Sequence, residues 1–241
     1  MAKRVGVILA GSGYRDGTDA AQAVIALLAL DRAGAEVICA APDQAQAVVA
    51  NHVSGELVPA KPPKRNLLVE AARLTRGPIG SLATLGDRDI DALIIPGGQG
   101  VGQSLSSYAD KGALCEVHPD VVRLLRALLA SHKPIGVMGL GAILAARVLG
   151  PVAGVRLTLG SKHPPAAKHA AVMGADMRPC PVDDVVVDQK ARVISTPAEM
   201  YDDAPLRQVA LGIEKLVRTV ISLARDHAPR PTVVPGATPP A

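Results

Sequence analysis

Two groups in this sequence are well placed to move protons. Asp19 lies just after a glycine-containing turn near the N-terminus, and His52 lies in a long irregular stretch. A carboxylate beside a histidine can transfer a proton to or from a small carbonyl compound without a covalent step. We therefore predict that Asp19 is the catalytic proton-transferring group and that His52 is its partner, provided that the long stretch folds over the turn. The alternative is that Asp19 caps a helix and His52 lies on the surface.

Three glycine turns provide candidate binding groups. Residues 11–13 and 97–100 each follow an apolar run, and Gly139 separates the run 135–138 from a helical pattern. Backbone N–H groups at such turns can bind an anion or a developing oxyanion, although tight packing of a strand against a helix would also require glycine. At Gly139 the glycine itself permits a strained φ angle. We predict a pocket for a small polar or anionic carbonyl compound, with these ligand-binding residues: Ser12, Gly13, Gln22, Gly98, Gln99, Gly139 and Leu140.

The elements that must position these groups alternate between strand and helix. Nearly continuous apolar runs predict strands that are covered on both faces, as in a parallel sheet. Expected strands cover residues 4–10, 36–41, 91–95, 135–138 and 155–160, with an edge hairpin over 184–196. Expected helices cover about 19–32, 66–74, 121–130, 143–146, 168–173 and 204–226. The pattern predicts one α/β domain over residues 1–226, and the five prolines of residues 227–241 predict a disordered tail.

Composition argues against several classes of protein. The 241 residues include no Phe, no Trp and only three Tyr, so the aromatic platforms of nucleic-acid readers are missing and we expect no nucleic-acid partner. We expect no membrane span and no signal peptide, and hence a cytoplasmic protein. The three widely spaced cysteines favour reduced thiols over disulfides or a metal site.

A dinucleotide cofactor is also unexpected. The first turn, residues 11–16, lacks the third glycine of the Rossmann fingerprint, and Ala41-Pro42 replaces the acid that would bind the ribose. We therefore predict that the protein uses no cofactor.

Several longer stretches resemble the ElbB family, named for enhancing lycopene biosynthesis, within the ThiJ/PfpI superfamily of class I glutamine-amidotransferase-like folds. They extend in order from about residue 3 to residue 224 and include Gly6-Val-Ile-Leu-Ala-Gly, Asn51-His52, residues 65–77, Asp91-Ala-Leu-Ile-Ile-Pro-Gly-Gly98, Met173-Gly-Ala and Pro179-Cys-Pro-Val-Asp-Asp184. The resemblance implies a doubly wound, mostly parallel, flavodoxin-like sheet sandwiched by helices. It also implies a homodimer with a small-molecule pocket at a nucleophile elbow.

The resemblance breaks down at that elbow. The family reads Gly-Phe-Met-Cys, and the same register here gives Gly136-Val-Met-Gly139; the supporting glutamate falls at Gln22, a neighbouring histidine at Ala21 and a turn cysteine at Ser12. Attack by a thiolate needs a sulfur and a proton acceptor, so a cysteine-dependent glyoxalase is not expected. We predict an enzyme with non-covalent acid–base chemistry, such as a lyase, hydratase or isomerase of secondary metabolism. The alternative is a catalytically silent binding or partner subunit.

Overall fold

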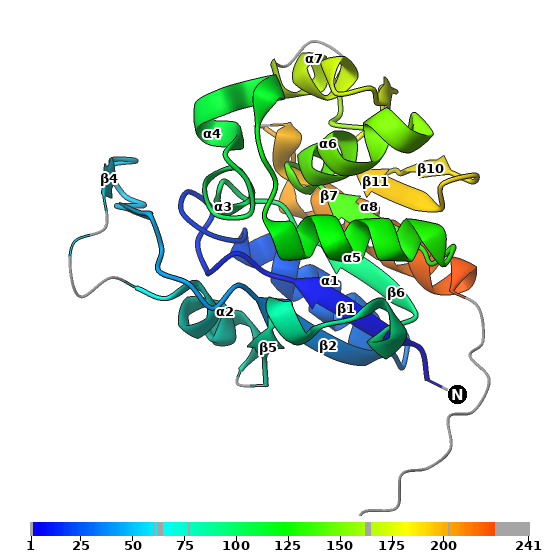
Figure 1. The fold of residues 1–241 in the computed structure, drawn as a ribbon, viewed down its shortest axis with the longest axis horizontal. Coiled ribbons are helices and arrows are strands. Elements are labelled where there is room, and N and C mark those ends of the chain that lie inside the picture. The colour runs from blue at the N-terminus through cyan, green and yellow to red at the C-terminus, as the bar shows by residue number, and fades with distance from the viewer. Residues whose placement is uncertain are drawn as a thin grey trace, which may run out of the picture.

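A seven-stranded sheet forms the centre of the protein (Figure 1). The structure is a computed structural model, and it describes residues 2–59, 61, 65–76, 78–161, 165–201 and 203–224. The strand order is β10-β11-β7-β6-β1-β2-β5, and every neighbouring pair is parallel except β10 with β11. The strands are β1 (Arg4–Ile8), β2 (Glu36–Ala41), β5 (Gly80–Ser81), β6 (Ala92–Ile95), β7 (Ile135–Met138), β10 (Val186–Asp188) and β11 (Val193–Thr196). The predicted doubly wound, mostly parallel α/β fold is confirmed.

Helices cover both faces of this sheet. Helices α1 (Ala20–Arg32), α2 (Leu67–Thr75) and α8 (Leu206–Leu223) pack on one face, and α5 (Pro119–Ala130) and α6 (Gly141–Ala153) pack on the other. Side chains alternate accordingly along the strands: Leu93 and Ile95 join the core under α5 and α6, whereas Ile94 joins the core under α1 and α8. Small residues let the layers approach, because a Cβ at Gly136 would lie 2.8 Å from Leu216 of α8.

The other described elements lie around this sandwich. Two further pairs of strands form separate small sheets, β3 (Val48–Ala50) with β4 (Leu57–Pro59) and β8 (Arg156–Leu157) with β9 (Asp176–Met177). The remaining helices are α3 (Gly100–Gln103), α4 (Tyr108–Lys111) and α7 (Pro165–Val172), with 3₁₀ turns at 82–84, 87–89, 112–114 and 198–200. No helix in the described ranges has both the length and the apolar character needed to cross a membrane.

The structure corrects two sequence predictions. The stretch 43–65 is not wholly irregular, because β3 and β4 form an antiparallel hairpin within it. The strand expected over 155–160 is reduced to β8, which pairs with β9 outside the main sheet. The predicted tail, residues 227–241, lies outside the described residues.

Candidate functional site

The turn from β7 into α6 forms an elbow at Gly139. This residue has a φ of +46°, and its N–H donates to the carbonyl of Thr196 at 3.1 Å. A Cβ at this position would lie 3.6 Å from the Pro197 carbonyl and 3.7 Å from the amide atoms of Gln22, which are ordinary contact distances. The elbow therefore has room for a small side chain but carries none.

A second turn, after β6, packs beside this elbow. Gly98 has a φ of +106°, and a Cβ there would lie 2.4 Å from the backbone nitrogen of Asp19, so only glycine fits. Its neighbour Gly97 packs against the elbow, because a Cβ on it would lie 3.2 Å from the nitrogen of Leu140. The N–H groups of Gly98 and Leu140 have no hydrogen-bond acceptor in the part of the chain that the structure describes. They are available to a ligand.

Gln22 connects the second turn to the opposite side of the site. Its Oε1 accepts a hydrogen bond from the N–H of Gly97 at 2.8 Å, which orients the amide. The Nε2 group then faces Glu199 and donates to its Oε2 at 3.4 Å. The Nε2 group of Gln22 is thus a hydrogen-bond donor next to the elbow.

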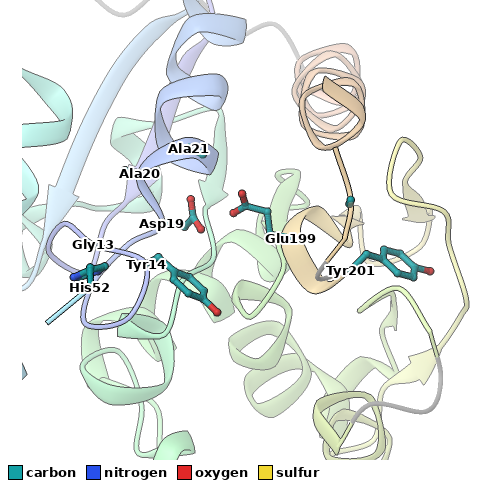
Figure 2. A pocket seen from close by; sticks show the side chains of 9 residues that line it. Gly13, Tyr14, Asp19, Ala20, Ala21, His52, Glu199 and Tyr201 are labelled. Carbon is teal, nitrogen blue, oxygen red and sulfur yellow. The ribbon is translucent and has the colours of Figure 1, made fainter. Parts of the chain in front are cut away.

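Two carboxyl groups face each other across the site (Figure 2). Asp19 is 5% exposed and caps α1 by accepting a hydrogen bond from the N–H of Gln22 at 3.1 Å. Its carboxyl group also forms a hydrogen bond with the carboxyl group of Glu199. This bond, burial and the negative charge of Asp19 together raise the pKa of Glu199 to about 7, although the hydrogen bond from Gln22 acts in the opposite direction. Glu199 is therefore only partly ionised near neutral pH.

The segment after β11 places Glu199 beside Asp19. Pro197 ends the strand, and Ala198 then adopts a φ of +50°, which is unfavourable for a residue with a Cβ. Because β11 runs parallel to β7, the residues that follow both strands meet at the same edge of the sheet. Backbone strain of this kind costs about 1–3 kcal/mol and is concentrated at functional sites.

These groups line two cavities. The inner cavity, about 190 Å³, lies at the elbow and is lined by Tyr14, Gln22, Gly98, Gln99, Gly139, Leu140, Glu199 and Met200. The outer cavity, about 560 Å³, is lined by Gly13, Tyr14, Asp19, Ala20, Ala21, His52, Glu199, Tyr201 and Ala204. Of the residues predicted from sequence, five line the inner cavity and three line the outer one, and Ser12 is among the lining residues of neither.

His52 is not joined to Asp19 by a hydrogen bond among the described residues. Its Nε2 accepts from the N–H of Arg15 at 3.3 Å and lies 3.8 Å from Oδ1 of the buried Asp16. Since Nε2 accepts from a backbone N–H, it does not simultaneously donate to Asp16 in this arrangement. His52 thus contributes to the wall of the outer cavity, and the partner of Asp19 is Glu199.

Cysteine does not contribute to either cavity in the described part of the chain. Cys39, Cys115 and Cys180 are all buried, and burial raises the pKa of each thiol, to about 11 for Cys39 and Cys180. They are therefore protonated at neutral pH and poorly nucleophilic. The described residues also contain no group of three or more His, Cys, Asp or Glu side chains arranged to hold a metal ion.

Sequence analysis missed Glu199 and Tyr14. The available signal was the position of Glu199 three residues beyond the expected strand that ends at Thr196. Treating 184–196 as a hairpin at the sheet edge hid the fact that β11 is also a parallel neighbour of β7. Tyr14 lies in the first glycine turn itself and is one of only three tyrosines in the chain.

Comparison with known proteins identifies relatives over almost the whole chain, although no protein-family model matches the sequence. The chain is 39% identical over 231 residues to the human glutamine amidotransferase-like class 1 domain-containing protein 3, mitochondrial, covering 92% of this chain and 84% of that protein. It is 38% identical to the rat ES1 protein homolog, mitochondrial, over 91% of this chain and 84% of the relative. The zebrafish ES1 protein, mitochondrial, is 30% identical, over 91% and 85%.

Solved structures show the same fold. A crystal structure of an isoprenoid biosynthesis protein with an amidotransferase-like domain, from Ehrlichia chaffeensis, has a TM-score of 0.85 and 30% identity, covering 93% of this chain and all of that one. Drosophila melanogaster DJ-1beta has a TM-score of 0.52 at 21% identity, over 93% of this chain and 96% of its own. The likeness to DJ-1beta concerns the fold alone.

The relatives correct one expectation and establish the family. The human, rat and zebrafish proteins are all named as mitochondrial, which overturns the prediction of a cytoplasmic protein. The sequence identity extends over most of each relative, and the fold of the Ehrlichia protein matches over 93% of this chain. The chain therefore belongs to the ES1-type glutamine amidotransferase-like class 1 proteins of the ThiJ/PfpI superfamily.

Proposed function

We propose that this protein is an ElbB-like acid–base enzyme that reversibly removes a proton from the carbon next to a carbonyl group, as a lyase, hydratase or isomerase would require. The observation that carries the proposal is the pKa of Glu199, raised to about 7 beside Asp19 in a cavity. A catalytic acid or base works best when its pKa is near the operating pH. Glu199 is then the group that accepts the proton, and Asp19 is the group that tunes it.

The cavity supplies the other requirement, stabilisation of the oxyanion. When the ionised Glu199 carboxylate takes the proton, the electrons of the C–H bond form a carbon–carbon double bond, and the carbonyl π electrons move to oxygen as an enolate. Gly98 and Leu140 line the inner cavity, and their unpaired N–H groups are suited to donate hydrogen bonds to that oxyanion. Return of the proton from Glu199 to carbon completes an exchange that needs no cofactor and no cysteine.

Gln22 has a supporting role in the proposal. Its carbonyl oxygen accepts a hydrogen bond from the N–H of Gly97, so its Nε2 group donates to Glu199 and favours the ionised carboxylate. A glutamate at this position would add a third carboxyl group beside Asp19 and Glu199. With an amide at position 22, the site contains, among the described residues, only the carboxyl groups of Asp19 and Glu199 at this point.

Deuterium exchange tests the proposal directly. Protein in D₂O is incubated with hydroxyacetone or 2-hydroxyacetophenone, and loss of the α-proton signal is followed by NMR. We expect catalysed exchange whose kcat/KM rises with pH through an apparent pKa near 7, because the ionised form of Glu199 is the base. Glu199→Gln should reduce exchange at least a hundredfold, within the usual contribution of a general base of about 10²–10⁴.

Asp19→Asn provides the matched variant. Asparagine retains an oxygen to cap α1, so the fold is preserved while the charge beside Glu199 is removed. The apparent pKa of exchange should then move below that of the unmodified protein. Exchange that is absent in the unmodified protein, or that survives in Glu199→Gln, contradicts the proposal; binding without exchange supports the silent binding subunit.

A further inference from the structure

The two cavities of the site lie next to each other and have part of their lining in common. Tyr14 and Glu199 line both of them, and no other residue is common to the two. Figure 2 shows the ring of Tyr14 extending from the first loop toward the segment that carries Glu199 and Tyr201. The two cavities are therefore neighbours that meet at Glu199 and Tyr14.

The inner cavity alone is small. Its volume of about 190 Å³ is below the range of ~300–1,000 Å³ typical of pockets for drug-sized ligands, whereas the outer cavity, at about 560 Å³, is within that range. Gly98 and Leu140, whose N–H groups are unpaired, line the inner cavity, so we place the carbonyl group of the substrate there. A three-carbon carbonyl compound bound in the inner cavity would not reach the outer cavity, which would then contain only water.

The residues that line the outer cavity suit an uncharged part of a ligand. Three alanines, Ala20, Ala21 and Ala204, contribute short apolar surfaces, and Tyr14 contributes an aromatic ring that is 48% exposed. The charged groups on its wall are the carboxyl groups of Asp19 and Glu199, and neither Lys nor Arg is among its lining residues. An anionic tail would be repelled there.

Tyr14 is fixed through its backbone but not through its hydroxyl. Its carbonyl accepts a hydrogen bond from the N–H of Gln99 at 2.8 Å, and the guanidinium of Arg15 lies 5.5 Å from the ring centroid. The hydroxyl has no hydrogen-bond partner in the described part of the chain. The ring can therefore rotate to pack against a bound group without breaking a hydrogen bond.

We infer that the substrate has two parts: a small carbonyl head in the inner cavity and an uncharged alkyl or aryl body in the outer cavity, packed on Tyr14 and on the alanines. This inference rests on the proposed function for the position of the reacting carbon. It adds a substrate class, namely carbonyl compounds substantially larger than three carbons and without an anionic tail.

Filling the outer cavity tests this substrate class. Ala21→Leu places a larger side chain in the outer cavity on the first turn of α1, where leucine is a good helix former. The kcat/KM for α-proton exchange is measured for hydroxyacetone, which fits the inner cavity, and for 2-hydroxyacetophenone, which needs both. We expect the ratio of the two values to shift against 2-hydroxyacetophenone by about tenfold or more, the usual effect of steric change in an apolar pocket.

Two further variants complete the design. Ala204→Leu fills the same cavity from the other side and should shift the ratio in the same direction. Val24→Leu is the control, because Val24 lies on the same helix, is 52% exposed and is among the lining residues of neither cavity. Its ratio should equal that of the unmodified protein.

Binding separates the failure of this inference from the failure of the proposed function. If the unmodified protein exchanges neither compound, saturation-transfer NMR with the same two compounds still reports occupancy. Binding of 2-hydroxyacetophenone that Ala21→Leu weakens and Val24→Leu does not supports the two-part site without catalysis. The inference is overturned if Ala21→Leu affects both compounds equally, or if the unmodified protein neither exchanges nor binds 2-hydroxyacetophenone.

Discussion

At the scale of single residues, Glu199 couples the stability of the fold to pH. Its pKa is about 7 in the folded protein against an ordinary value of 4.5, so the folded state holds a proton that the unfolded chain releases between these values. Stability from this group is therefore fully present below pH 4.5 and is lost as the pH rises through 7. The ionised form is penalised by Asp19 and by burial.

Glu199→Gln should remove this penalty. We expect the variant to melt above the unmodified protein by about 2–4 °C at pH 8, corresponding to about 1 kcal/mol after screening by solvent at a half-buried carboxyl. The difference should shrink toward zero near pH 4, where the glutamate is protonated in both states. Circular dichroism melts from pH 4 to pH 8 measure it, and a melting difference that does not vary with pH contradicts this interpretation.

Gly139 leads to a second prediction at the residue scale. Gly139→Cys introduces a thiol where a Cβ makes contacts no shorter than 3.6 Å, at a cost of about 1–2 kcal/mol for the positive φ. The new thiol should be alkylated by iodoacetamide at pH 7 much faster than the three native thiols, which are buried. Peptide mass spectrometry of the folded protein identifies the modified residue, with the unmodified protein as the control.

At the scale of elements, the first loop holds the β3–β4 hairpin in place. Oδ2 of the buried Asp16 accepts a hydrogen bond from the N–H of Ala50 at 2.8 Å, and Gln46 donates to the Asp16 carbonyl at 2.9 Å. The hairpin carries His52, which accepts from the N–H of Arg15. The position of the outer wall of the site therefore depends on Asp16.

Asp16→Ala should loosen this hairpin. Loss of the acceptor leaves the Ala50 N–H without its partner, at a cost of about 1–3 kcal/mol. Hydrogen–deuterium exchange should increase across residues 48–58 and remain unchanged in α5. Glu56→Ala is the control, because Glu56 is exposed on the same hairpin and its side chain makes no hydrogen bond among the described residues; equal exchange in the two variants would show that Asp16 does not anchor the hairpin.

The main elements were predictable from sequence where periodicity was strong. The strands β2 and β7 were predicted to the residue, and Asp19 caps α1 as the alternative interpretation of that residue expected. The β3–β4 hairpin was missed because each strand has only three residues, and those residues are partly buried in β3 and exposed in β4. Short strands of this kind are defined by tertiary contacts rather than by local pattern.

The candidate site was less predictable than the fold. The glycine turns predicted the elbow and the turn beside it. Glu199, however, lies far from Asp19 in the sequence, and the parallel pairing of β11 with β7 brings it to the site. A single sequence contains no direct signal for that pairing. Predictions of proton partners that depend on how a long loop folds, such as that of His52, are therefore weaker than predictions of strands.

At the scale of the whole molecule, we expect a homodimer that does not need residues 227–241. The body exposes large apolar side chains on neighbouring helices, including Val24 and Leu28 of α1 and Leu211 of α8. The sequence after residue 226 has five prolines and few apolar residues suited to an interface core. Light scattering on a chain ending at Asp226 should give the dimer mass, and a monomer would show that the removed residues are required.

The free space at Gly139 also has a consequence for the evolution of the site. Each cysteine codon differs from a glycine codon by one base, so a thiol can arise at this position in a single mutational step. Because a Cβ there makes only ordinary contacts, that step requires no compensating change in the surrounding side chains. Selection could therefore move a protein of this shape between thiol chemistry and carboxylate chemistry while the sheet, the helices and the two cavities stay as they are.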